Sequence, residues 1–209
     1  MIITGIFPSG GEKELIIVTE QDEKYRITLS DAKENGLFGI DKKDFPFEFD
    51  NDELLVFLSE KLKAIKYCTY LLSFSDKSAS QLKQKLREKE YSKEVSSEAI
   101  RVLCQAGIVD DDTVCVRKAQ IMAKSKLYGP YRIKAELSAK GFSRETVDEA
   151  IENLNVDFDE TLTQLIEKLC STSKYDLSDR NELLKFKAKL SRYGYGSESI
   201  NRAVRDIYE

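Results

Sequence analysis

The chain has 209 residues, of which 41% are hydrophobic and 33% are charged, and its net charge is −4. It contains no histidine, which excludes Ser-His-Asp and Cys-His nucleophiles and every metal site that needs an imidazole ligand. With only 10 glycines and 3 prolines the composition favours helix, and the length allows one medium domain or several small units in a row.

The first fifty residues are typical of β structure. Residues 2–7 and 15–19 are apolar runs rich in β-branched side chains, and the turn sequence PSGG separates them at residues 8–11. Tyr25, Ile27 and Leu29 alternate with polar residues, as in a half-buried strand. We therefore expect a small three-stranded β-meander, which needs a further element to pack on.

A helical period begins near residue 52. Apolar residues recur at three- and four-residue steps from Leu54 to Leu72, behind an N-cap at Asp50 or Asp52. This pattern predicts a long helix over residues 53–73. The remainder of the chain also has a helical pattern, with interruptions that recur.

These interruptions reveal an internal repeat. Residues 82–103 resemble residues 133–154 and residues 186–207, with shifts of 51 and then 53 positions and no gap inside the window. A period near 50 residues is typical of stacked supersecondary units. We expect a mostly α protein with a β-rich N-terminal extension and three three-helix repeats. The predicted boundaries are 1–50 for the extension and 51–109, 110–156 and 157–209 for the repeats.

Capping signals predict the ends of several helices. Residues 78–81, with the sequence SASQ, form a capping box for helix two of the first repeat. In the second repeat, residues 110–112 are three aspartates that we interpret as a turn and N-cap, because they lack the alternation of a calcium loop. Pro130 suits the first turn of helix two, and Gly141 suits the position after its end.

The first repeat departs from this pattern at one position. Glu90 stands where the other two copies have Gly141 and Gly194. A left-handed residue other than glycine costs about 1–2 kcal/mol. We therefore expect helix two of the first repeat to end differently.

Four cysteines, Cys68, Cys104, Cys115 and Cys170, lie far apart and form no C-x-x-C pair. We expect four buried thiols in a reducing compartment, with disulfide pairing as the alternative. The N-terminus has no secretory signal pattern, and the longest apolar run covers only residues 54–58. The expectation is a cytoplasmic protein that does not enter the membrane.

Positive charge is concentrated on helices one and two of the repeats. Residues 1–60 hold 6 basic and 14 acidic side chains, whereas residues 113–140 hold seven basic side chains and one acidic side chain. The basic segment suits a polyanion, and the tyrosines within it either stack on bases or belong to the core. The lysines at positions 83, 134 and 187 share one register, either as a ladder along a phosphate backbone or as ordinary solvated helix positions. The predicted DNA- or filament-binding residues are Lys83, Arg117, Lys118, Lys124, Lys126, Tyr128, Tyr131, Arg132, Lys134, Lys185, Lys187, Lys189 and Arg192.

The order of these motifs resembles the RecX family, which regulates the RecA recombinase. The most specific segment is residues 126–137, with the sequence KLYGPYRIKAEL, followed by KGF at residues 140–142. Shorter similar segments are SQLKQKL at residues 80–86 and GIVDD at residues 107–111. The resemblance covers residues 54–209, and the β-rich front end resembles an extension found in many Gram-positive-type members.

The resemblance implies a curved, elongated monomer that lies in the groove of the RecA–DNA filament. Such proteins inhibit strand exchange, ATPase and co-protease activity in DNA repair, recombination and SOS control. The implied partners are the RecA filament and single- or double-stranded DNA, without cofactor, metal or catalysis. Arg132 and Lys134 fall on the basic segment of the family that follows Gly-Pro. The chain departs from the family pattern at Tyr131, where a basic residue is common, and at Cys115, where alanine is usual.

The residues by themselves leave two other functions open. A helical-repeat scaffold would bind only protein partners and would not bind DNA at low salt. A helix-turn-helix module would discriminate between duplex sequences and would usually be a dimer. No catalytic constellation is visible in the sequence, so none of these functions is enzymatic.

Overall fold

The computed structural model describes residues 1–10, 13–172 and 175–208, and the chain forms two compact units. Unit 1 comprises Met1–Asp76 and Leu82–Val109, and unit 2 comprises Lys77–Gln81 and Asp110–Glu209. In the described part of the chain, no helix is long and apolar enough to cross a membrane. Gly11 of the predicted turn and the side chain of Ile207 in the third copy lie outside the described residues.

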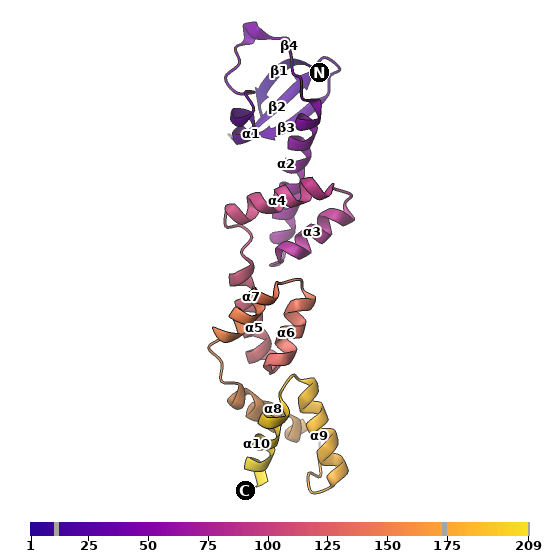
Figure 1. Cartoon of the computed structure of the whole chain (residues 1–209), viewed down its shortest axis with the longest axis vertical. Helices are drawn as coiled ribbons and strands as arrows, with labels where there is room; N and C mark the ends of the chain where they lie inside the picture. Colours follow the sequence, from indigo (N-terminus) through magenta and orange to yellow (C-terminus); the bar gives the residue numbers. More distant parts are fainter. Residues whose placement is uncertain (11–12, 173–174, 209) are drawn as a thin grey trace. The chain divides into compact units, whose positions relative to one another are not determined.

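Unit 1 begins with an antiparallel sheet in the order β3-β2-β1-β4 (Figure 1). The strands are β1 (Ile2–Pro8), β2 (Glu14–Thr19), β3 (Lys24–Thr28) and β4 (Phe47–Glu48). The meander of β1, β2 and β3 was predicted, whereas β4 was not. Its two residues pair with Ile2 and Ile3 at the edge of β1.

A short helix corrects the predicted end of the third strand. Leu29 was expected in the strand, but it begins α1 (Leu29–Glu34). The Thr28 side chain caps this helix by accepting a hydrogen bond from the Asp31 N–H. A 3₁₀ turn, η1 (Lys42–Asp44), follows before β4. The strand pattern therefore ends one residue earlier, where a helix cap competes with it.

The long helix α2 (Asp52–Leu72) packs on the sheet through β3 and also packs on α4 within unit 1 (Figure 1). Its leucines Leu55 and Leu58 are buried with Ile3, Ile17 and Ile27 of the strands. The predicted caps Asp50 and Asp52 are wrong, because Asn51 accepts the hydrogen bond from the Leu54 N–H at 3.0 Å. Asp52 instead binds the N-terminal ammonium at 2.5 Å.

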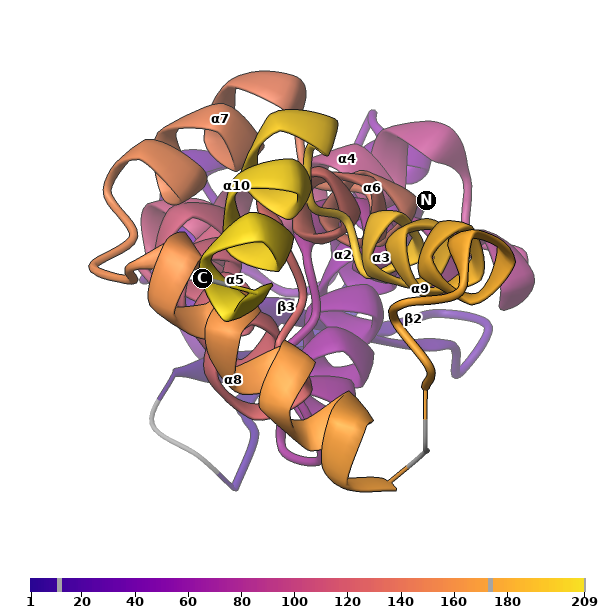
Figure 2. The same cartoon turned by 90° about the horizontal axis from the view of Figure 1, so that it is seen from below.

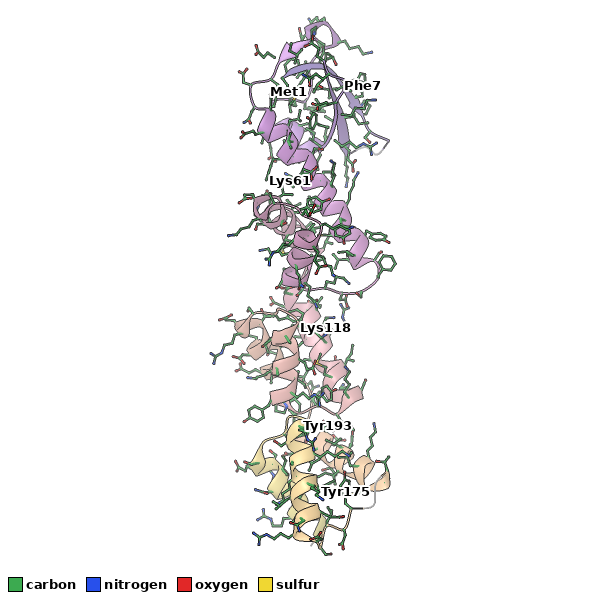
Figure 3. All side chains as sticks on the ribbon, turned by 90° about the vertical axis from the view of Figure 1, so that its right-hand side faces the viewer. Met1, Phe7, Lys61, Lys118, Tyr175 and Tyr193 are labelled. Atoms are coloured by element: carbon green, nitrogen blue, oxygen red, sulfur yellow. The ribbon has the colours of Figure 1, made fainter. Side chains whose placement is uncertain are left out.

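A buried ion pair joins α1 to α2. Lys61 of α2, labelled in Figure 3, lies 2.6 Å from the Asp31 carboxylate, and both side chains are only 8% exposed. Asp31 also accepts a hydrogen bond from the Thr28 hydroxyl at 2.8 Å. The carboxylate is therefore held by two partners away from water, which a buried charge requires.

The remaining helices follow the predicted threefold pattern. Unit 1 is completed by α3 (Ala79–Glu88), whose first turn belongs to unit 2, and by α4 (Lys93–Gln105). Unit 2 contains α5 (Asp111–Lys126), α6 (Pro130–Ala139), α7 (Arg144–Glu152), α8 (Phe158–Thr172), α9 (Arg180–Arg192) and α10 (Ser197–Tyr208). Helix α5 packs on α6 and α7, and α10 packs on α8 and α9 (Figure 2). The equivalent residues Leu82, Ile133 and Phe186 are all fully buried, so the predicted register is confirmed.

Hydrogen bonds confirm the predicted capping box at residues 78–81 and the predicted cap at Asp110. The Gln81 side chain accepts from the Ser78 N–H at 3.1 Å, and the Ser78 hydroxyl oxygen accepts from the Gln81 N–H at 3.2 Å. Asp110 caps α5 by accepting from the Thr113 N–H at 3.0 Å. The next two aspartates accept hydrogen bonds from the Ala79 N–H and the Thr146 hydroxyl.

The expectation for Glu90 is wrong. Glu90 adopts φ +63°, in the same left-handed region as Gly141 and Gly194. The Tyr91 N–H donates to the Leu86 carbonyl and the Glu90 N–H donates to the Arg87 carbonyl, which is the Schellman pattern. These bonds end α3 as the equivalent bonds end α6 and α9, and they offset the strain of the side chain.

The cysteines divide into two classes. Among the described residues the four cysteines form no disulfide, as expected. Cys68 and Cys115 are buried, and burial raises the pKa of each thiol to about 11. Cys104 and Cys170 are exposed, so the prediction of four buried thiols is wrong for these two.

We expect Lys61→Ala to lower the free energy of unfolding of unit 1 by about 3–5 kcal/mol, because it leaves the buried Asp31 carboxylate without its cation. Urea unfolding of the full chain followed by circular dichroism measures this change. The matched control is Lys66→Ala, which removes the exposed pair with Glu14 and should cost less than about 1 kcal/mol. Equal losses in the two variants would contradict a special role for the buried pair.

We expect Glu90→Gly to raise the free energy of unfolding by about 1 kcal/mol, because glycine adopts the left-handed conformation without strain. Thermal unfolding reports the change. Lys89→Gly, one residue earlier and outside the left-handed region, should be neutral or destabilising. A stabilisation by both glycines would refute the strain at Glu90.

Candidate nucleic-acid interface

The connection between α5 and α6 ties the second repeat to the third inside unit 2. Leu127 follows α5 with φ +55°, and its side chain is buried with Leu165 and Phe186 of the third repeat. The Tyr195 hydroxyl donates a hydrogen bond to the Leu127 carbonyl at 3.2 Å. Burial raises the pKa of Tyr195, so the hydroxyl stays protonated as a donor.

Two glycines allow the backbones of these repeats to meet. The Gly129 N–H donates to the Tyr193 carbonyl at 2.8 Å, and the Tyr131 N–H donates to the Gly194 carbonyl at 3.2 Å. A Cβ atom on Gly129 would overlap the Gly194 carbonyl oxygen, and one on Gly194 would overlap the Arg132 backbone. Neither position accepts a side chain, so the predicted motif Gly-Pro has a packing role as well as a helix-starting role.

Cations and aromatic rings stack at this connection. The Arg132 guanidinium lies 3.9 Å from the centroid of the Tyr128 ring, and the Lys126 ammonium lies 5.6 Å from the same ring. Tyr128 meets Tyr193 edge to face at 5.9 Å. Arg132 also donates to the Arg192 carbonyl at 3.1 Å. We call Lys126, Tyr128, Arg132, Arg192 and Tyr193 the junction cluster.

Sequence reasoning missed Tyr193, which Figure 3 labels at the end of α9. The signal was present, because Tyr193 precedes the Gly194-Tyr195 pair that the repeat alignment singled out. Tyr193 contacts Tyr128, which lies 65 positions earlier in the sequence. A contact over this separation depends on how the two repeats pack, so no local sequence pattern predicts it.

Tyr131 extends the junction cluster towards solvent. Its side chain is 68% exposed at the start of α6, next to Arg132. Tyr128 is half-buried under the guanidinium, so it supports the cation, whereas Tyr131 is available for stacking. An exposed aromatic ring beside a cationic group is a suitable platform for an unpaired base and its phosphate.

Two lysines of the predicted ladder link helices within their own repeats. Lys134 of α6 lies 2.5 Å from Asp148 of α7 and lowers the pKa of that carboxyl. Lys187 of α9 donates to Asn201 of α10 at 2.8 Å. Both partners are 14 residues further along the chain, so these lysines connect helix two to helix three. Lys83 lies in unit 1, where Ser97 holds the equivalent partner position.

The other predicted residues do not join the junction cluster. Lys189 of α9 donates to the hydroxyl of Tyr175, which Figure 3 labels, at 3.0 Å within the third repeat. Lys124, Lys185 and Arg117 are exposed, and Lys118 of α5 is half-buried. Of the predicted residues, the structure brings together Lys126, Tyr128, Tyr131, Arg132 and Arg192.

Family models match the chain in two places. The model described as RecX, first three-helix domain, matches residues 64–101, and the model described as RecX, second three-helix domain, matches residues 110–151. A regulatory protein RecX of Actinobacillus pleuropneumoniae serotype 5b is 33% identical over 105 residues, which cover 50% of this chain and 69% of the relative. A regulatory protein RecX of Geobacillus sp. is 23% identical over 203 residues, covering 91% and 74%.

Two solved structures are also similar to this chain. A crystal structure of a regulatory protein RecX superposes with a TM-score of 0.75 at 19% identity, covering 97% of this chain and 98% of that one. A crystal structure of RecX from Lactobacillus salivarius gives a TM-score of 0.63 at 25% identity, covering 70% and 96%. The first likeness supports the fold, including the N-terminal sheet.

We expect Gly129→Ala to destabilise unit 2 by about 1–3 kcal/mol, because the added methyl group overlaps the Gly194 carbonyl oxygen. Denaturant unfolding of the full chain measures the loss. Gly10→Ala is the control, since open space surrounds that position, and it should change stability by less than about 0.5 kcal/mol. An equally small effect at Gly129 would mean that the two repeats do not dock through their backbones.

Proposed function

This chain belongs to the RecX family of regulatory proteins, and we propose that it binds the groove of a RecA–DNA nucleoprotein filament and inhibits the recombinase. The inhibited activities are strand exchange, ATP hydrolysis and co-protease activity, in DNA repair, recombination and SOS control. The protein acts as a cytoplasmic monomer, without catalysis of its own. Its working parts are the extension 1–50 and the repeats 51–109, 110–156 and 157–209.

The junction cluster is the observation that supports this proposal most directly. Arg132 and Lys126 both contact the Tyr128 ring, and the exposed Tyr131 lies beside Arg132 at the start of α6. Cations fixed by aromatic rings neutralise phosphates without first being ordered on binding, and an exposed ring adds base stacking. This combination suits the single-stranded or distorted DNA inside a recombinase filament.

The distribution of charge suggests how the partners are divided. Residues 113–140 are basic, whereas residues 145–160 hold seven acidic side chains and no basic one. The basic helices α5 and α6 contact DNA, and the acidic helix α7 and the acidic extension contact protein. Occupation of the groove then blocks duplex entry or the subunit rearrangements that are coupled to ATP hydrolysis. Because counterions are released from the DNA, binding weakens steeply with salt.

The test is a titration of the full chain into RecA filaments preassembled on single-stranded DNA, with ATP hydrolysis as the readout. We expect loss of hydrolysis at or below one protein per RecA subunit. Unchanged hydrolysis together with absent filament binding would overturn the proposal. Binding to naked duplex DNA with sequence discrimination would indicate a helix-turn-helix reader, and no DNA binding at low salt would indicate a protein scaffold.

We expect Tyr131→Ala to weaken filament binding about 5- to 150-fold, because one stacked base contributes about 1–3 kcal/mol. Fluorescence anisotropy of the labelled filament measures the affinity. The side chain is 68% exposed, so the fold should be unaffected. The control is Tyr70→Ala, an exposed tyrosine of α2 outside the basic segment, which should leave binding unchanged. Equal effects of the two substitutions would contradict stacking by Tyr131.

A further inference from the structure

Unit 1 contains a hollow of about 470 Å³ between α3 and α4 that the proposed function does not use. Its described lining is Lys83, Arg87, Tyr91, Lys93, Ser96 and Ser97, and we call it the oxyanion hollow. The lining contains three cations, three hydroxyl groups and, among the described lining residues, no carboxylate. Of these residues only Lys83 was predicted to bind DNA.

Ser96 is the most unusual residue of the oxyanion hollow. It is 7% exposed, and its hydroxyl is buried without a hydrogen-bond partner among the described residues. The equivalent positions of the other repeats are Val147 and Ile200, which are buried apolar residues. A buried hydroxyl without a partner costs folding free energy, whereas an apolar residue at this position does not. The hydroxyl therefore points to a partner that is not part of the chain.

The cations of the oxyanion hollow also differ from those of the other repeats. Lys134 and Lys187 each bind a partner 14 residues further along, but Lys83 has Ser97 at that position. Arg87 stands where the other copies have Ser138 and Ser191. Within the described structure, no hydrogen bond or ion pair engages the side chains of Lys83, Arg87 or Lys93.

Two carboxylates of α3 and α4 near the hollow are already engaged. Glu88 is bound to Lys85 at 2.6 Å, and Glu98 is bound to Arg101 at 2.6 Å. These two carboxylates do not neutralise the lining, and although Glu94 follows Lys93 in the first turn of α4, the three cations leave an excess of positive charge at the hollow. The hollow also lies at the N-terminus of α4, a helix of 13 residues whose positive dipole end favours an anion.

We propose that the oxyanion hollow binds a phosphate-type oxyanion, either as free phosphate or as a phosphodiester of a nucleic acid. Lys83, Arg87 and Lys93 neutralise the charge, and the exposed Ser97 hydroxyl donates a hydrogen bond to its oxygens. The Ser96 hydroxyl, which is covered in this structure, donates after its side chain rotates towards the hollow. A tetrahedral group with several acceptor oxygens satisfies these donors together, which a halide or a single carboxylate does not. The proposal goes beyond filament binding and stands independently of it, because free phosphate is a sufficient ligand.

The test uses the full ¹⁵N-labelled chain without RecA. Inorganic phosphate is titrated at constant ionic strength against chloride, and the amide signals of Ser96 and Ser97 report binding. A second titration uses oligothymidylate, which distinguishes a phosphodiester from free phosphate. Saturable shifts at these amides with either probe support the site, and shifts with both probes in competition assign it to the nucleic-acid backbone.

Two variants and one matched control make the test specific. Ser96→Val restores the residue type of Val147 and should keep or raise the melting temperature while weakening phosphate binding at least fivefold. Arg87→Gln should weaken it about tenfold, as expected for the loss of one charge-assisted hydrogen bond. Arg26→Gln, an exposed arginine of β3 in the same unit and outside the lining, should leave binding unchanged.

The proposal is overturned if Ser96→Val and Arg87→Gln bind phosphate as the unchanged chain does. It is also overturned if the shifts do not saturate, which would indicate a diffuse charge effect. Because the first titration contains neither RecA nor DNA, its failure is independent of the filament proposal. Conversely, a chain that binds phosphate but does not affect ATP hydrolysis would keep the oxyanion hollow and lose the filament function.

Discussion

Backbone contact between Gly129 and Gly194 is the constraint on which the arrangement of unit 2 depends. Hydrogen bonds from the Gly129 and Tyr131 N–H groups cross directly to the third repeat, and a side chain on either glycine would prevent them. This approach places Arg132 against Tyr128 and close to Tyr193. The candidate interface is therefore a product of the docking of two repeats, and each repeat alone supplies only part of it.

Equivalent positions of helices two and three make different contacts in the three repeats. The lysine of helix two binds an acid in the second repeat and an amide in the third, and in the first repeat it faces a serine. In helix three, the buried residue just before this partner is Ser96 in the first repeat, Val147 in the second and Ile200 in the third. Since helix two of each repeat keeps a buried apolar pair, these positions vary without loss of the fold. The pairs are Leu82 with Leu86, Ile133 with Leu137 and Phe186 with Leu190. In the second and third repeats the lysine of helix two therefore binds helix three, whereas in the first repeat the equivalent Lys83 lines the oxyanion hollow.

Among the residues that the structure describes, the buried polar side chains divide into those with a hydrogen-bond partner and one without. Lys61 and Asp31 neutralise each other inside unit 1, with Thr28 as a further partner, so their burial is compatible with stability. The Ser96 hydroxyl has no such partner in the described structure, although it is buried to a similar degree. Buried polar groups without partners are rare in folded proteins, and a recognition role explains one better than a packing role.

The sequence by itself determined the repeat, its register and most helix ends. These depend on local physics: helical periodicity, the capping box at residues 78–81, the Asp110 cap and Pro130 at a helix start each act within a few residues. The sequence also identified the basic segment of the second repeat and the family it resembles.

Only the tertiary structure decided the left-handed Glu90, the added strand β4, and the partners of the lysines at positions 134 and 187. Packing overrode the local cost at Glu90, because two backbone hydrogen bonds and the half-buried Tyr91 hold the chain there. The junction cluster and the oxyanion hollow were likewise beyond sequence reasoning. Their members meet across separations that no local period encodes, and the distances between side chains depend on how whole helices pack.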